Sequence, residues 1–265
     1  MSTTVRVEKI DVSSATREII REPVALESPI NIFVNDRYVI TLLATPQYKK
    51  ELALGWLFDE GILECFDEIE QILEQTDSVK VLIKHCMKEE NLKVVGVSRL
   101  LTTACGLTSL EFFKIIDGLS QEVVVSNYSI SADTVIKLVQ RLDEGSLFRS
   151  TGGVHVAALF EDEELVAFAE DVGRHNTIDK VIGIGIQASI NFSNSILVSS
   201  GRQPADIVLK AARVGIPIIA SKSAPIRSGI IAAEKTGITL ACFARTHRIN
   251  VYTHHRRITT HYQSR

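Results

Sequence analysis

Cysteine is scarce in this 265-residue sequence, and its four cysteines lie far apart. Such wide, irregular spacing in a chain of this length excludes a scaffold held together by disulfides. It also gives no matched ligand pair with the spacing of a zinc site, so we predict no metal site. We interpret all four as reduced thiols, and we expect Cys65, Cys86 and the neighbouring His85 to be structural or incidental.

Long hydrophobic runs are also missing. No apolar run approaches the roughly 18 residues that a membrane-spanning helix needs. The start, Met1-Ser2-Thr3-Thr4, has no apolar core of a secretory signal peptide. These absences predict a cytoplasmic protein that makes no use of a membrane, and the hydrophobic content of 45% is sufficient for a folded core.

Several catalytic and nucleotide-binding motifs are absent. The sequence has neither a Walker A loop nor the glycine fingerprint of dinucleotide-binding folds. No Pro-Cys-x-x-Cys follows a His-x-Glu, which excludes the zinc deaminase signature. A catalytic serine has no nucleophile elbow to support it.

Charge is distributed unevenly, although the formal net charge is only -3. Residues 201–265 contain 11 Lys and Arg and two acids, which is +9; residues 1–200 contain 18 Lys and Arg and 30 acids, which is -12. The basic third predicts either a bound anionic ligand or a surface that docks on the acidic part of a second copy. It lacks the interleaved aromatic residues of a nucleic-acid tract, so we expect no DNA or RNA partner.

The pattern of apolar residues predicts an α/β protein with two domains. Residues 1–98 should form a small α+β domain, with a hairpin at 30–44 and a helix after Pro46. Residues 99–129 connect it to a second domain, 130–265, in which strands alternate with helices. This rhythm predicts a mainly parallel sheet that is covered on both faces and binds ligands beyond the carboxyl ends of its strands. The strands expected there are 154–160, 165–170, 195–199, 216–220, 238–244 and 249–253.

Cys105 is the best candidate nucleophile. It lies in a run of small and hydroxyl residues, 102–109, just before an amphipathic pattern at 109–117 that predicts a short helix. Backbone N–H groups at the start of a helix favour a thiolate over a thiol. The alternative is a loop cysteine with no reactive role.

Three polar loops follow expected strands, at 170–176, 199–203 and 221–225, and each leads into a helix. Each combines backbone N–H groups, small residues and one cation, which suits a nucleotide or another phosphate-bearing ligand. The alternatives are that Arg174 and Asp179 bridge structural elements and that His175 caps a helix or is structural. A further glycine-bearing loop at 151–155 is either a turn or part of the same site.

Together these segments resemble the formate dehydrogenase accessory sulfurtransferase family (FdhD/NarQ). The match runs in order through the Cys105 loop, 150–155, 170–180, 200–202 and 243–245, and the segment 170–180, EDVGRHNTIDK, is highly specific. The resemblance implies a C-terminal cytidine-deaminase-like three-layer domain without the deaminase zinc site. It also implies a homodimeric sulfurtransferase that carries sulfur as a cysteine persulfide from a cysteine desulfurase to the molybdenum cofactor, bis(molybdopterin guanine dinucleotide), of formate dehydrogenase.

The resemblance assigns the persulfide to Cys105. Many family members have Cys-x-x-Cys in this loop, but the second position here is Thr108. A single thiolate is enough to hold a persulfide sulfur, whereas an internal disulfide at this loop is excluded. The family's cofactor-binding segment corresponds to Phe243, Ala244, Arg245, Thr246, His247 and Arg248, and the polar loops add Arg174, His175, Gly201 and Arg202 as expected cofactor contacts.

Two other functions fit the same residues. One is a non-catalytic chaperone that protects the molybdenum cofactor for formate dehydrogenase, with Cys105 only touching it. The other is a nucleotide-sensing regulatory domain, which leaves Cys105 unused. A sulfur atom gained by Cys105 from a desulfurase separates a carrier from a chaperone.

Overall fold

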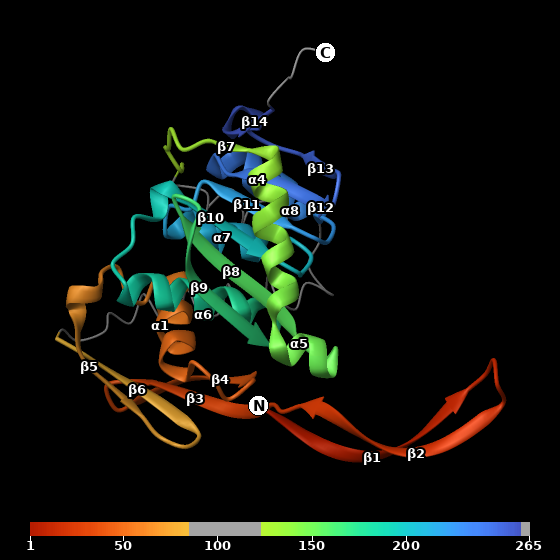
Figure 1. The fold of residues 1–265 in the computed structure, drawn as a ribbon. Helices are drawn as coiled ribbons and strands as arrows, with labels where there is room; N and C mark the ends of the chain where they lie inside the picture. The colour runs from red at the N-terminus through yellow and green to blue at the C-terminus, as the bar shows by residue number, and fades with distance from the viewer. Residues whose placement is uncertain (85–122, 261–265) are drawn as a thin grey trace, which may run out of the picture.

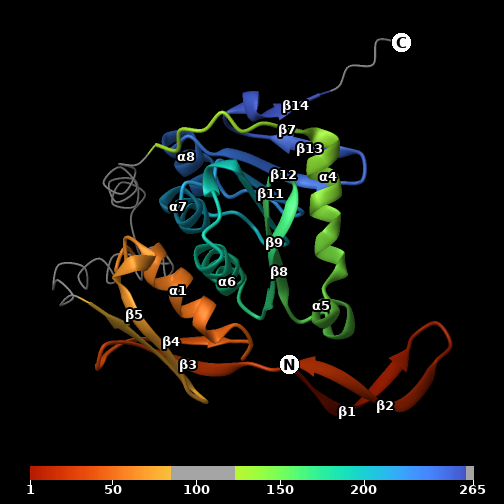
Figure 2. The same ribbon diagram turned by 60° about the vertical axis from the view of Figure 1, so that its left-hand side comes forward.

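The structure is a computed structural model that describes residues 1–84 and 123–260. It begins with a hairpin arm of two ten-residue strands, β1 (Ser2–Asp11) and β2 (Thr16–Ala25), which pair antiparallel along their whole length. The arm projects from the rest of the molecule in both ribbon views (Figures 1 and 2). Nearly all of its side chains are exposed.

A four-stranded sheet in the order β4-β3-β6-β5 follows the arm. Its first two strands form the expected hairpin, in which Asn35 and Asp36 make a two-residue turn and Asn35 adopts a positive φ of 54°. The helix α1 (Lys49–Asp59) packs on this sheet and buries Leu52 and Trp56. The strands are β3 (Ser28–Val34), β4 (Arg37–Ala44), β5 (Ile69–Glu74) and β6 (Ser78–Ile83).

Two glycines join this N-terminal unit to the rest of the chain, where α1 packs against α6 (Arg174–Gln187), as Figure 2 shows. A Cβ on Gly55 of α1 would lie 1.9 Å from the carbonyl oxygen of Asp179, and one on Gly183 of α6 would lie 2.0 Å from that of Glu51. Only glycine permits so close an approach of two helix backbones.

The second sheet has the order β13-β12-β11-β10-β8-β9. It is mixed, because β10–β11 and β11–β12 are parallel while the other three pairings are antiparallel, so the expectation of a mainly parallel sheet is wrong. Two-residue turns join β8 to β9 and β12 to β13, and so short a connection can link only antiparallel strands. The strands are β8 (His155–Glu161), β9 (Glu164–Asp171), β10 (Ser195–Ser199), β11 (Ile218–Ser221), β12 (Thr239–Arg245) and β13 (Arg248–Val251).

Helices cover both faces of this sheet, which gives three layers (Figure 2). One hydrophobic core joins the sheet to α6, α7 and α8, and another joins its opposite face to α4. The closer likeness to a cytidine deaminase and the domain boundaries stay predictions. The remaining elements are α4 (Ala132–Gln140), α5 (Ser146–Thr151), α7 (Ala205–Arg213), α8 (Arg227–Thr236) and the paired short strands β7 (Ile130–Ser131) and β14 (Ile258–Thr259).

Local signals set the helix ends as expected. The Ser131 hydroxyl caps α4 by accepting a hydrogen bond from the Thr134 N–H at 3.0 Å. Gly237 ends α8 in the left-handed conformation, with φ of 76°. No helix within residues 1–84 and 123–260 is long and apolar enough to cross a membrane.

Candidate anion-binding edge

The expected polar loops lie along one side of the second sheet, where the carboxyl ends of several strands meet. We call this side the basic edge. Because β8 is antiparallel to both β9 and β10, the strands β9, β10, β11 and β12 all run in one direction. Their carboxyl ends and the start of β8 therefore share an edge. The helices α6, α7 and α8 begin there, and none of them has a side-chain hydrogen bond at its N-cap. Helix N-termini gathered in this way favour an anion.

Hydrogen bonds hold these loops together around Gly201. The Ser221 hydroxyl donates to the Gly201 carbonyl at 2.7 Å, and the Gly201 N–H donates to the Ser199 hydroxyl at 3.1 Å. The Lys222 N–H donates to the Ser199 carbonyl at 3.1 Å. Gly201 also contacts the loop after β9, where a Cβ at this position would lie 3.1 Å from the Cβ of Arg174. A small residue at position 201 lets the loops meet.

A cluster of basic side chains surrounds His155 at the start of β8. Burial lowers the pKa of His155, and the positive charges of Arg174, His175 and Arg202 lower it further. The Nδ1 atom of His155 lies 3.5 Å from the Ser200 hydroxyl. A bound phosphate would relieve the part of this lowering of the pKa that comes from neighbouring charges. The structure thus brings together Arg174, His175 and Arg202, as expected.

Arg174 and His175 differ in the side chains that they contact. The Nε of Arg174 is buried and has no hydrogen-bond partner among the described residues, which leaves it a donor for a ligand. The Nε2 of His175 lies 2.7 Å from Oδ2 of Asp206 in the first turn of α7. Burial opposes ionisation of Asp206, but the contact with the His175 imidazole lowers the pKa of this carboxyl. His175 is therefore positioned by Asp206 and links α6 to α7.

The expected cofactor segment at 243–248 lies farther along the same edge. The Phe243 N–H donates to the Ser223 carbonyl at 3.0 Å, which ties the end of β12 to the loop after β11. Phe243 and Ala244 pack into the cores on the two faces of the sheet, so they support the edge from within. The other four positions, 245–248, are exposed and form the turn into β13.

The basic turn at 245–248 and the basic cluster at His155 lie at different places on the edge, because β11 and β10 stand between β12 and β8. Three strand spacings amount to roughly 14 Å. Such a span suits an extended dinucleotide better than a single phosphate.

The segment 170–180, EDVGRHNTIDK, also stabilises the fold. Asp171 is fully buried and accepts hydrogen bonds from Lys180 Nζ at 2.5 Å and from the Thr45 N–H at 3.0 Å. It also accepts from the Gly173 N–H and from Asn176 Nδ2, both at 2.8 Å. Lys180 Nζ donates in addition to the Thr45 carbonyl at 2.9 Å. Because Thr45 directly follows β4, this buried ion pair fastens the start of α6 to the N-terminal sheet.

Asp179 has a structural role as well. Lys210 of α7 lies 2.6 Å from Oδ1 of Asp179 and 3.0 Å from Oδ2 of Asp59 in α1. Burial by itself would lower the pKa of Lys210, but the two carboxylates raise it. This ion cluster joins α1, α6 and α7.

The candidate nucleophile, Cys105, lies outside the described residues, as does Cys86, so the role of Cys105 stays a prediction. Cys242 in β12 is fully buried, and burial raises the pKa of its thiol to about 12. A thiol in that environment is a poor nucleophile. Cys65 is exposed, which makes it a useful comparison for any experiment on Cys105.

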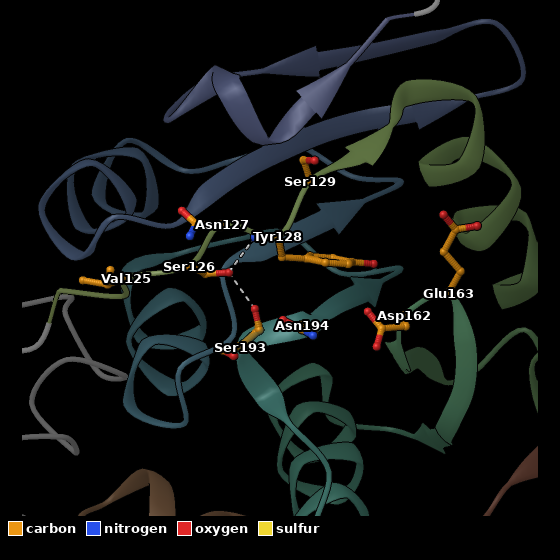
Figure 3. A pocket seen from close by; sticks show the side chains of 9 residues that line it. All are labelled: Val125, Ser126, Asn127, Tyr128, Ser129, Asp162, Glu163, Ser193 and Asn194. Carbon is orange, nitrogen blue, oxygen red and sulfur yellow. Dashed lines mark hydrogen bonds between the residues drawn. The ribbon is translucent and has the colours of Figure 1, made fainter.

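A polar cavity of about 760 Å³ lies at the opposite edge of the sheet, beside the β8–β9 turn (Figure 3). Burial raises the pKa of Tyr128 there to about 12, and the charges of Glu163 and Asp162 contribute. Among the described residues, the lining has these two carboxylates and no Lys or Arg, so these charges disfavour phosphate and the cavity does not suit the expected cofactor. It is lined by Val125, Ser126, Asn127, Tyr128, Ser129, Asp162, Glu163, Ser193 and Asn194.

We expect GDP to raise the pKa of His155, because a phosphate beside Arg174 and Arg202 offsets the charges that disfavour the imidazolium. Without ligand, His155 should titrate below the ordinary value of 6.5. The measurement is a pH titration of the histidine ring signals by NMR, with and without GDP. His255, exposed beyond the other end of β13, serves as the control and should not respond. A His155 signal that GDP leaves unmoved would contradict a phosphate site here.

The fold and this edge define a three-layer α/β protein with the features of an anion site, and comparison with known proteins gives its family. The sequence matches the FdhD/NarQ family over residues 25–259. It is 36% identical over 241 residues to the sulfur carrier protein FdhD of Bacillus pumilus (strain SAFR-032), which covers 90% of this chain and 91% of the relative. The corresponding protein of Sulfolobus acidocaldarius is 37% identical over 239 residues, covering 89% and 90%.

A solved structure agrees with these matches. The crystal structure of a formate dehydrogenase accessory protein from Desulfotalea psychrophila has a TM-score of 0.78 to this chain at 27% sequence identity, and the match covers 97% of this chain and 99% of that one. This chain therefore belongs to the FdhD/NarQ family, which confirms the resemblance found in its sequence motifs.

Proposed function

We propose that this protein is a sulfur carrier that takes sulfane sulfur from a cysteine desulfurase onto Cys105. It passes this sulfur to its substrate, the molybdenum cofactor bis(molybdopterin guanine dinucleotide), for use by formate dehydrogenase in the cytoplasm. The names of the relatives support sulfur carriage, and the similar solved structure supports the link to formate dehydrogenase. The observation that carries cofactor binding is the buried Nε of Arg174, which has no partner among the described residues and belongs to a side chain that lies against Gly201, next to Arg202 in the chain.

The transfer needs one thiolate. Cys105 attacks the terminal sulfur of the donor persulfide, the donor S–S bond breaks, and the donor cysteine leaves as a thiolate. The new S–S bond makes Cys105 the persulfide. On delivery, the sulfane sulfur takes up an electron pair from the molybdenum centre, becomes a sulfide ligand, and leaves Cys105 as a thiolate. The presence of Thr108 in place of a second cysteine is compatible with both steps.

The basic edge would bind the phosphates of the cofactor. Arg174 and Arg202 can each pair bidentately with a phosphate, and the first turn of α6 adds its backbone N–H groups. Arg245 and Arg248 offer a second pair of guanidinium groups at the β12–β13 turn. The cofactor carries two guanine dinucleotide arms, and basic groups at both ends of the edge can hold one arm each.

We expect Arg174→Ala and Arg202→Ala to weaken GDP binding, with GDP as a surrogate for a cofactor arm. Loss of a charge-assisted contact should cost about 1.5–3 kcal/mol, or roughly 10- to 150-fold in Kd by calorimetry. Arg245→Ala and Arg248→Ala should weaken binding at the second site likewise. Lys137→Ala, on the exposed side of α4, is the matched control and should bind as wild type does. Unchanged affinity for GDP in all four arginine variants would contradict a cofactor site at this edge.

A further inference from the structure

The hairpin arm carries two arginines side by side on one face. The strand register places Arg6 directly opposite Arg21, so both guanidinium groups lie on the same side of the arm. Like charges opposite each other destabilise a strand pair, and neither arginine has an ion-pair or hydrogen-bond partner among the described residues. Ile10 and Ile19 lie on the same face and are 52% and 59% exposed. Glu8 and Arg17 share this face as well, but they form an ion pair with each other at 3.4 Å. We call Arg6, Arg21, Ile10 and Ile19 the arginine face.

The arm has little to stabilise it within its own chain. An isolated two-stranded hairpin is only marginally stable in water, and both outer edges of this one have unpaired backbone groups. Its contact with the body lies near its base, where Ala25 packs against Gly153. A partner that covers Ile10 and Ile19 and pairs Arg6 and Arg21 would supply the missing stability.

The N-terminal sheet carries a surface of matching chemistry. Residues 51–79 contain nine Asp and Glu and no Lys or Arg. Lys80, which lies opposite Leu73 in the strand register, is paired with Asp36 at 2.8 Å. Within residues 51–79, Asp67 and Glu70 are exposed and have no ion-pair or hydrogen-bond partner in the described part of the chain. Phe66 and Leu73 beside them are 42% and 36% exposed. Strand β5 is an edge strand of the four-stranded sheet. We call Phe66, Asp67, Glu70 and Leu73 the acidic edge.

The arginine face and the acidic edge cannot meet within one chain. The arm and β5 lie at opposite ends of the molecule in both ribbon views (Figures 1 and 2). We propose that the arginine face docks on the acidic edge of a second copy of this chain. In a two-fold symmetric dimer each arm reaches the other chain's edge, so the contact forms twice. The arm, and not the C-terminal third, is then the basic surface of the expected homodimer. This contact between two copies does not depend on sulfur transfer.

Charge reversal tests the contact in the full-length protein, with the dimer dissociation constant measured by analytical ultracentrifugation. We expect wild type to be a dimer at micromolar concentration. Arg6→Glu with Arg21→Glu should raise the dissociation constant at least about tenfold, as should Asp67→Arg with Glu70→Arg. Mixing the two variants, or combining all four changes in one chain, should restore the dimer, because each reversed arm then meets a reversed edge.

The control is Lys137→Glu, an exposed reversal on α4, which should leave the dimer unchanged. Circular dichroism and thermal melting should show every variant folded, since all the altered side chains lie outside the hydrophobic cores. A monomeric wild type, a wild-type dissociation constant in the arm variant, or failure of the fourfold variant to re-associate would each overturn the proposal. A monomer whose arm binds formate dehydrogenase would assign the arm to that partner and would also overturn it.

Discussion

Cys105→Ser is expected to abolish activation of formate dehydrogenase while the protein stays folded. A serine hydroxyl does not hold a persulfide sulfur, so the proposed carrier is lost and dehydrogenase activity should fall at least about 100-fold. The measurement is dehydrogenase activity in cells that lack the native protein and carry the variant instead. Wild-type activity with Cys105→Ser would contradict the sulfur-transfer mechanism.

Cys65→Ser is the matched control for this experiment. Cys65 is an exposed cysteine, and its replacement should leave dehydrogenase activity near wild type. Cys86→Ser should retain activity too. Cys242→Ser is less suitable, because Cys242 is fully buried in the core, and a loss there would report on folding.

Lys180→Met is expected to destabilise the protein strongly. The change leaves the carboxylate of Asp171 buried without its cation, which should lower the free energy of unfolding by about 3–5 kcal/mol. Both side chains of this pair are completely buried in the folded protein. The measurement is the free energy of unfolding from a urea titration. A loss below about 1 kcal/mol would contradict the view that this pair fastens the two sheets together.

A second change separates charge from packing at this site. Adding Asp171→Asn to Lys180→Met removes the buried charge while the oxygen of the new amide can still accept from the Gly173 N–H and from Asn176 Nδ2. We therefore expect the double variant to recover part of the lost stability. Lys137→Met, an exposed lysine on α4, is the control, with an expected change within about 0.5 kcal/mol.

Local sequence signals predicted most of the helices and strands of the described chain. The Asn35-Asp36 turn, the Ser131 cap and the Gly237 helix end depend on neighbouring residues alone, and all three are confirmed. The arm was missed because its valines and isoleucines alternate with charged residues and have no core to face. Its strands are stabilised by pairing with each other and not by burial.

Strand direction was harder to predict than strand position. The turn between β8 and β9 is built from Asp162 and Glu163, with φ of 44° and 72°, and contains no glycine or asparagine to reveal it. The gap between the expected strands 154–160 and 165–170 was nevertheless too short for a parallel crossover. The polar loops still share one edge, because two successive antiparallel pairings return β9 to the direction of β10.

The site was predicted in part. The polar loops predicted that Arg174, His175 and Arg202 share one edge, whereas the loop 151–155, which ends at His155, was left open as either a turn or part of the same site. The role of Asp171 and Lys180 in fastening the fold was missed. That role depends on Thr45, which precedes Asp171 by 126 residues and which no local pattern connects to it.

The most direct test of the proposed function is mass spectrometry of the full-length protein after incubation with a cysteine desulfurase and cysteine that carries heavy sulfur. We predict one labelled sulfur atom on Cys105, which a thiol reductant removes, which Cys105→Ser lacks and which Cys65→Ser retains. An unmodified Cys105 in the presence of an active desulfurase would contradict the sulfur-carrier mechanism and favour a cofactor chaperone.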